Sequence, residues 1–301
     1  MKYYSHGKLL LTAEYSVLDG ATALALPTRL GQYMTVETTS SNQIQWKSID
    51  SNQTTWIDCS LDFSFNLIEN RGTPLRLIDS LIDILKAVDS LAPGFYGNGV
   101  TVCTELEFDR HWGLGSSSTL IANLADWLAI NPYRLLKDTF GGSGYDLAAA
   151  KASKPILYQR NKTTPKVEEI DFLPPFADQL FFLYLNQKQN SRSAISSFRQ
   201  KQTLVQSDLN QISQLTKKIV VATTQEQFDA LLVEHEEITA QFIGQTPVKK
   251  RLFEDFSGQL KSLGAWGGDF VLVSGNSDSP AYFKSKGFAT IIPYNKMILS
   301  A

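Results

Sequence analysis

Hydrophobic and polar positions follow two rhythms along the 301 residues of the chain. Short runs in which β-branched or aromatic residues alternate with polar ones predict strands. These runs are residues 32–39, 43–47, 99–108, 154–159 and 180–185. Residues 75–91 instead carry leucine, isoleucine and valine three and four positions apart, and Pro74 precedes them, so a helix is predicted there. A second helix is predicted around Thr119, directly after a run of glycine and serine.

The Pro174-Pro175 pair is the clearest break in the middle of the chain, and we place a domain boundary there. Beyond this break the spacing predicts three helices and two strands. The helices cover 192–222, 225–243 and 248–263, and the strands 270–274 and 288–293. Strands and helices thus alternate in both halves without the regular βα period of a barrel. The pattern predicts an α+β fold with domains 1–175 and 176–301.

The composition is that of a globular protein and excludes several classes. Hydrophobic residues make up 43% and charged residues 19%, which is too apolar for a disordered chain. The net charge of −2 gives no overall attraction to nucleic acid or to an anionic membrane. No stretch reaches the ~18 apolar residues of a membrane span. The two cysteines, Cys59 and Cys103, are too few for a disulfide framework or a four-cysteine zinc site. Lys8 falls where the apolar core of a secretion signal would begin, so the cytoplasm is the expected location.

Residues 112–119, with the sequence WGLGSSST, are the first segment that carries candidate chemistry. Glycines let the backbone approach a ligand, and the helix behind them directs unpaired N–H groups and a partial positive charge at the loop. This arrangement suits a phosphate, and one of the hydroxyls could face Mg²⁺. The alternative is a serine-capped helix start without a ligand. A Walker A loop is excluded because no Gly-Lys-Ser/Thr follows, and the dinucleotide motif is excluded because Ser118 replaces its third glycine.

Three further segments are ambiguous when each is taken alone. In residues 7–15, GKLLLTAEY, Lys8 and Glu14 bracket an apolar run that would also suit an edge strand. Residues 140–150, FGGSGYDLAAA, place Asp146 at a helix start, where it is either an N-cap or a positioned carboxylate that takes a proton. Residues 261–269, KSLGAWGGD, form a glycine-rich turn that would also suit an ordinary helix C-cap.

The order and spacing of these four segments resemble the GHMP kinase superfamily, from Gly7 to Asp269. The run Gly-Tyr-Asp-Leu-Ala is similar to the bacterial GYDIA branch, and Gly-Ser-Gly-Tyr-Asp is similar to a motif of phosphomevalonate kinases. The resemblance implies a two-domain fold. The N-terminal domain would resemble the second domain of ribosomal protein S5, and the C-terminal domain would be ferredoxin-like.

The resemblance further implies an ATP- and Mg²⁺-dependent kinase that phosphorylates a hydroxyl or phosphate of a small molecule, with mevalonate or phosphomevalonate favoured. The residues implied to wrap the ATP phosphates are Gly113, Leu114, Gly115, Ser116, Ser117 and Ser118, with Ser117 on Mg²⁺. Asp146 matches the catalytic Asp, and Lys8 matches the lysine that pairs with it. The residues implied to lie near the acceptor are Glu14 and Tyr15, at a position near the acceptor or the metal, and Gly267 and Gly268 in its pocket. Ser191 and Arg192 carry donors suited to an acceptor phosphate or carboxylate, although the segment would also suit a solvated loop.

The sequence departs from the family at positions that bear on catalysis. Trp266 stands where a small residue is usual, and Leu135 stands where several members have a glutamate that binds Mg²⁺; Asp138 is the nearest acid. Two alternative functions therefore stay open: a catalytically silent ligand-binding sensor with this fold, and a diphosphomevalonate decarboxylase. A small-molecule acceptor is the expected partner, without nucleic acid or membrane, and a homodimer is compatible with the sequence. His235 lies among three glutamates, which predicts a solvated helix face.

Overall fold

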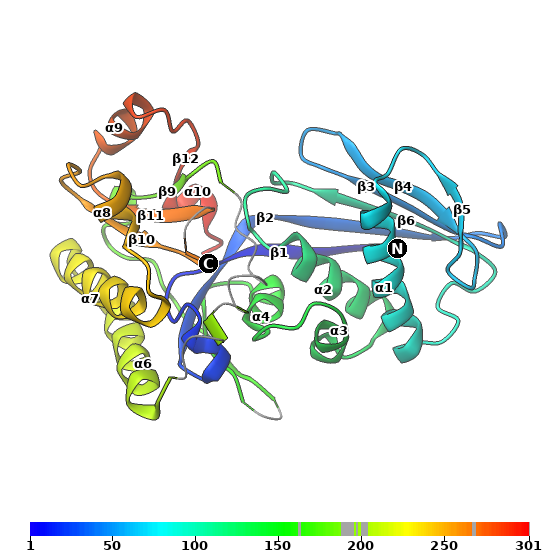
Figure 1. Ribbon diagram of the computed structural model, residues 1–301, viewed down its shortest axis with the longest axis horizontal. Coiled ribbons are helices and arrows are strands. Elements are labelled where there is room, and N and C mark those ends of the chain that lie inside the picture. Colours follow the sequence, from blue (N-terminus) through cyan, green and yellow to red (C-terminus); the bar gives the residue numbers. More distant parts are fainter. Residues whose placement is uncertain (162–163, 188–195, 197, 200–203, 267–268, 301) are drawn as a thin grey trace. The chain divides into compact units, whose positions relative to one another are not determined.

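The computed structural model describes residues 1–161, 164–187, 196, 198–199, 204–266 and 269–300. Over these residues the chain divides into two compact units (Figure 1). The first unit comprises 1–7, 30–110 and 114–151, and the second comprises 8–29, 111–113 and 152–301. The chain passes between them several times, so each unit is built from separate stretches of sequence. The boundary predicted at residue 175 stays a prediction.

The first unit is a mixed sheet with helices on one side (Figure 1). Its strands are the first part of β1 (Lys2–Leu10), most of β2 (Ala23–Thr38), β3 (Ile44–Ile49), β4 (Thr55–Leu61), β5 (Leu67–Asn70) and β6 (Val100–Leu106). Their order is β5-β4-β3-β6-β2, with β1 paired to β2. β3 runs parallel to β6, and the other neighbours in this order are antiparallel. The helices are α1 (Leu75–Leu91), α2 (Ser116–Leu128), α3 (Pro132–Thr139) and α4 (Tyr145–Lys151).

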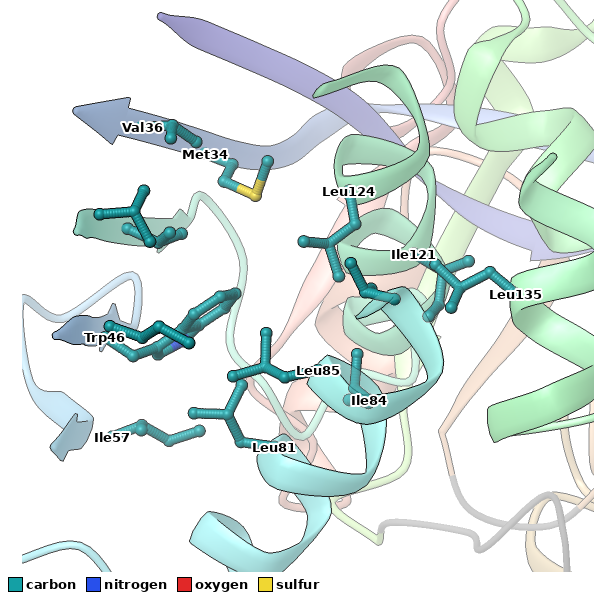
Figure 2. Close-up of a cluster of buried hydrophobic side chains, with 14 of the residues drawn as sticks. Met34, Val36, Trp46, Ile57, Leu81, Ile84, Leu85, Ile121, Leu124 and Leu135 are labelled. Carbon is teal, nitrogen blue, oxygen red and sulfur yellow. The ribbon is translucent and has the colours of Figure 1, made fainter. Parts of the chain in front are cut away.

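The core of the first unit lies between this sheet and its helices (Figure 2). Strands β2, β3 and β4 contribute side chains on one side, and α1, α2 and α3 contribute leucines and isoleucines on the other. The labelled members are Met34, Val36, Trp46, Ile57, Leu81, Ile84, Leu85, Ile121, Leu124 and Leu135. Helical spacing in α1 places its apolar side chains along one stripe, as residues 75–91 predicted. The alternation of the strands supplies the facing side chains.

The second unit contains a smaller antiparallel sheet covered by helices. Its sheet has the order β10-β11-β9-β12, from β9 (Leu180–Tyr184), β10 (Gln259–Ser262), β11 (Phe270–Ser274) and β12 (Ile291–Pro293). The start of β2 pairs with β7 (Ile156–Gln159), which pairs with β8 (Lys166–Glu169). The helices are α6 (Gln206–Val220), α7 (Gln225–Ile243), α8 (Val248–Leu252), α9 (Ser279–Ser285) and α10 (Tyr294–Met297), with short 3-10 turns at Ser16–Asp19 and Ala177–Gln179. α7 packs against both α6 and β10.

Most predicted elements are confirmed, and the predicted α+β class with them. Helices 75–91 and 225–243 appear with these bounds. The helix predicted over 248–263 is confirmed over Val248–Leu252 and wrong beyond it, because the chain then forms strand β10. Just before β10, a Cβ on Gly258 would lie 2.2 Å from the carbonyl oxygen of Ser274, so glycine allows the chain to approach β11 closely at this point. The helix predicted over 192–222 is confirmed over Gln206–Val220, and part of its start lies outside the described residues.

Within the part of the chain that the structure describes, no helix is both long enough and apolar enough to cross a membrane.

Leu135 offers a direct test of the core. Its side chain is fully buried, so Leu135→Ala removes apolar contacts and leaves a cavity, and the free energy of unfolding should fall by about 2–5 kcal/mol. Leu75→Ala is the control, because that leucine is 63% exposed and its truncation should change stability by less than ~0.5 kcal/mol. Urea unfolding of both variants measures the difference, and equal losses would contradict the placement of Leu135.

Candidate active site

The glycine-serine loop ends in the first turn of α2. Gly115 has the left-handed conformation, with φ 89° and ψ 43°, and α2 begins at the next residue. The Ser118 hydroxyl donates to the Gly115 carbonyl over 2.8 Å, which ties the helix start to the loop, whereas the Ser117 side chain is exposed. The first N–H groups of a helix lack partners within it and carry a partial positive charge. A helix start of this kind is suited to an anion, and the exposed Ser117 hydroxyl lies in its first turn, so the phosphate site stays a prediction.

The other end of this loop is held inside the second unit. The Lys8 ammonium donates to the Gly113 carbonyl over 2.9 Å. Gly113 has φ +67°, and a Cβ on it would lie 2.3 Å from a carboxylate oxygen of Asp269. The Trp112 ring packs edge-on against Phe270, with the ring centroids 5.4 Å apart. Only glycine fits between Asp269 and the backbone path that the loop takes at this point.

Asp146 lies in the first turn of α4, which packs against α2. The glycines before it, Gly141, Gly142 and Gly144, all have positive φ, so the chain turns sharply into the helix. The side chain of Asp146 is half-buried. Burial, with a contribution from the Asp146 charge, raises the pKa of the neighbouring Tyr133. The start of a helix favours an ionised carboxylate, which suits a group that accepts a proton.

Glu14 lies in a buried group of charges in the second unit. Lys261 on β10 donates to Glu14 Oε1, and its Nζ lies 3.3 Å from Oε2 of Glu236 on α7. Lys261 and His235 are 0% exposed, Glu14 1% and Glu236 4%. Burial raises the pKa of Glu14 to about 7, although the Lys261 charge acts in the opposite direction. Lys261 contacts Glu14 Oε1, and the Glu14 carboxylate is buried within this group, so its assignment to the acceptor or to the metal stays a prediction.

Tyr15 joins the same region to the glycine-rich turn after β10. Its hydroxyl donates to the Ala265 carbonyl over 2.9 Å, and its ring packs with Phe198 and Trp266. Burial, with a contribution from the Glu14 charge, raises the pKa of Tyr15 to about 12, so this hydroxyl keeps its proton. Trp266 has φ +53°, a conformation that favours glycine. Its ring is buried in this cluster, so the large side chain at a position where the family usually has a small one contributes to the core of the second unit.

The remaining predicted site residues have different outcomes. Ser191, Arg192, Gly267 and Gly268 lie outside the described residues. Leu135 lies in the core and Asp138 is exposed. Among the residues that the structure describes, no cluster of three or more His, Cys, Asp or Glu side chains could hold a metal ion.

The solvated helix face predicted around His235 is wrong for His235 and Glu236. Both are buried against β10 and the segment around Ala13, because α7 turns one side inward. The spacing of Phe228, Leu232 and His235 indicates this buried face, whereas the flanking glutamates hide it. Lys261 was missed as a partner of Glu14, because a separation of 247 residues leaves no local signal.

No protein-family model matches the sequence, and no curated protein matches it. Solved structures match it over nearly its whole length. The mevalonate kinase of Methanococcus jannaschii is 16% identical with a TM-score of 0.67, covering 95% of this chain and 94% of that one. A Streptococcus pneumoniae phosphomevalonate kinase, solved with phosphomevalonate and AMPPNP, is 15% identical with a TM-score of 0.69, covering 95% of both chains. The galactokinase of Lactococcus lactis, solved with galactose, is 12% identical with a TM-score of 0.66, covering 100% of this chain and 94% of that one.

Gly113 and Gly141 give a matched pair for testing the loop. Both have φ +67°, but a Cβ on Gly113 meets Asp269, whereas a Cβ on Gly141 meets nothing within 4 Å. Gly113→Ala should therefore destabilise the protein by at least ~1 kcal/mol more than Gly141→Ala, because only the first adds a clash to the backbone strain. Urea unfolding of both variants measures the difference. Equal losses would show that Asp269 does not constrain the loop.

Proposed function

Because the chain has the two-domain fold of the GHMP kinases, we propose that it is an ATP- and Mg²⁺-dependent kinase of a small molecule. The observation that carries the proposal is the glycine-serine loop at the start of α2, with the half-buried Asp146 at the start of α4. An anion site and a carboxylate at two neighbouring helix starts are what phosphoryl transfer requires, since this reaction depends on positioning and charge stabilisation.

The start of α2 would bind the phosphates of ATP. The backbone N–H groups that follow Gly115 and the exposed Ser117 hydroxyl are the donors available there. When bound, Mg²⁺ would supply positive charge that offsets the negative charge of the phosphates. Mg²⁺ commonly keeps several waters and takes few protein ligands when phosphates are present, and the Ser117 hydroxyl is the protein contact that we assign to it. Lys8 would hold this loop in place through the Gly113 carbonyl.

Asp146 would act on the acceptor. An ionised carboxylate at a helix start can orient a hydroxyl and accept its proton as the phosphoryl group is transferred. Lys8 would keep that carboxylate ionised in the catalytic state, since a nearby cation lowers the pKa of a carboxyl group. The pairing of Lys8 with Asp146 rests on the family resemblance.

We favour mevalonate or phosphomevalonate as the acceptor. Kinases named for these substrates are among the structures that match the chain, and the Gly-Ser-Gly-Tyr-Asp run has the same resemblance. A galactokinase matches with a similar TM-score, so the fold alone does not select the acceptor. The residues that we assign to the acceptor side are Glu14, Tyr15, Ser191, Arg192, Gly267 and Gly268.

A specific observation favours a second candidate, a ligand-binding protein without turnover. Several GHMP kinases bind Mg²⁺ through a glutamate at the position of Leu135, and here that side chain is part of the core. Such a protein would bind Mg-ATP and release no ADP.

Asp146→Asn tests the kinase proposal. ADP release from Mg-ATP is measured with mevalonate, phosphomevalonate, galactose and homoserine. The wild type should turn over one acceptor, and the variant should lose at least ~10²-fold in kcat with ATP affinity within a few-fold, because the amide cannot accept a proton. Asp138→Asn is the control, since that carboxylate is exposed on α3. Turnover retained in Asp146→Asn would remove Asp146 from the mechanism, and silence of the wild type despite ATP binding would favour the second candidate.

Ser117→Ala tests the magnesium contact. Loss of a hydroxyl that touches a charged group should raise the KM for Mg-ATP by about 10-fold and shift the Mg²⁺ dependence to higher concentration. Ser80→Ala, an exposed serine on α1, is the control. An unchanged Mg²⁺ dependence in Ser117→Ala would refute its role as a metal contact.

A further inference from the structure

The loop that carries Glu14 has an unusual backbone. Ala13 has φ 64° and Tyr15 has φ 61°, left-handed conformations that L-amino acids with a Cβ adopt at a cost. Both residues are buried, and neither is a glycine. A conformation of this kind persists only when the surrounding structure fixes it, and such strain is concentrated at functional sites. The contacts that fix this loop are therefore informative about its use.

His235 on α7 holds the first of these strained residues. Its Nε2 accepts a hydrogen bond from the Ala13 N–H over 2.9 Å, so this nitrogen carries no proton. The proton of the neutral ring is then on Nδ1, which lies 3.2 Å from the Thr239 hydroxyl and donates to it. Burial and the Lys261 charge lower the pKa of His235 well below its usual value, which agrees with a neutral ring. The 3.7 Å contact between Nε2 and Glu14 Oε2 therefore joins two acceptors and is no ion pair.

The two carboxylates beside Lys261 are satisfied unequally. Glu236 accepts from the Ser262 N–H at 3.1 Å and from the Ser262 hydroxyl at 2.6 Å, and it contacts Lys261. Glu14 accepts from Lys261 at Oε1, but its buried Oε2 has no hydrogen-bond donor among the described residues. An ionised carboxylate oxygen without a donor costs far more free energy in the interior than the uncharged oxygen of a protonated carboxyl group does. A proton on this carboxylate pair therefore belongs on Glu14.

The charges of the cluster agree with this placement. With both carboxylates ionised, the described side chains of the cluster carry one positive and two negative charges, because His235 is neutral. One proton on Glu14 makes the buried group neutral, which removes the cost of burying an unpaired charge.

We propose that Lys261, Glu236 and His235 are positioning residues that fix Glu14 and its strained loop, and that they do so with one proton held by the Glu14–Glu236 pair. The role of this loop in binding the acceptor rests on the proposed function. The shared proton and the fixed position of the loop do not depend on that function. His235 holds the backbone at Ala13, Lys261 holds the Glu14 side chain, and Glu236 holds Lys261 in place.

The state of this proton depends on groups from each element packed around Glu14. The loop itself supplies Glu14 and Tyr15, α7 supplies His235 and Glu236, and β10 supplies Lys261. From α6, the uncharged Thr216 hydroxyl donates to Thr12. The pKa of Glu14 is raised in the folded protein, from about 4.5 to about 7. The folded protein thus binds the Glu14 proton more tightly than the unfolded chain does. The free energy of unfolding gained from this proton is lost as the pH rises through about 7.

Glu14→Gln tests the proton directly. Glutamine has the shape of protonated glutamate and can still accept from Lys261 through its carbonyl oxygen, but it does not titrate. Urea unfolding is followed from pH 5 to pH 8. Over this range the folding equilibrium constant of the wild type should fall roughly 70-fold relative to that of the variant, the size set by a pKa of about 7. Parallel stability curves for the two proteins would overturn the proposal.

Two controls make this comparison selective. Glu237→Gln removes a glutamate from the same helix whose side chain is exposed, so its curve should follow the wild type. Infrared difference spectra of the wild type between pH 5 and pH 8 should contain a protonated-carboxyl band that titrates near pH 7. This second measurement needs no variant, so it can overturn the proposal even if Glu14→Gln does not fold; burial raises the pKa of Asp229 only to about 6, so its band would titrate at lower pH. Absence of such a band would overturn it.

Kinetics test the positioning role separately. With the acceptor found in the panel above, Glu236→Gln should raise the acceptor KM by about 10-fold or more and leave the KM for ATP within about two-fold, because the loop alone is disturbed. Glu237→Gln should change neither constant. A parallel rise of both constants would overturn the positioning role. If the wild type phosphorylates no acceptor while the stability curves diverge as expected, the kinase proposal fails and the shared proton stands.

Discussion

The buried ammonium of Lys261 is the constraint on which the order of the second unit depends. A charge removed from water must be neutralised and hydrogen-bonded within the protein, and loss of one partner of such a pair typically costs about 3–5 kcal/mol. Here the partners come from the loop around Glu14 and from α7, and Lys261 also donates to the Ser262 carbonyl over 2.6 Å. One side chain thereby fixes β10, a helix and a loop that are far apart in sequence. The hydrogen bonds from this cluster to the loop stabilise the left-handed conformations of Ala13 and Tyr15.

The first unit uses a different principle at its two helix starts. α2 and α4 begin directly after glycines with positive φ, so the chain reaches each helix through a conformation that other residues avoid. Each turn leads directly into the N-terminal, positive end of its helix, and α2 packs against α4. The hydrophobic core under α1, α2 and α3 supplies the rigidity, and the helix ends supply the charge. The residues of the glycine turns and those of the core thus lie in different stretches of the sequence, and the helices connect them in the fold.

The parts that the sequence predicts correctly are those with local causes. The helix at 75–91 follows from apolar spacing behind a proline, and the start of α2 follows from the glycine-serine run. Phe253, Phe256 and Leu260 have helical spacing, which favours a helix over 248–263. Beyond Leu252 the prediction fails because residues 259–262 pair with β11, a strand further along the chain. The burial of His235 was missed for a similar reason. Three neighbouring glutamates predict a solvent-exposed helix face. The groups that pair with the buried His235 and Glu236 are Ala13 and Lys261, which lie far away in the sequence.

The two departures from the family pattern have the same physical character. Leu135 replaces a charged residue and becomes part of a hydrophobic core, and Trp266 replaces a small residue and becomes part of an aromatic cluster with Tyr15 and Phe198. Trp266 also has a positive φ of 53°, a conformation that favours glycine, so a bulky side chain occupies a turn position at which glycine is common. Both side chains are buried, although the indole N–H of Trp266 has no hydrogen-bond partner among the described residues. At both positions the chain thus places a buried hydrophobic side chain, and the packing of its own unit accommodates that side chain.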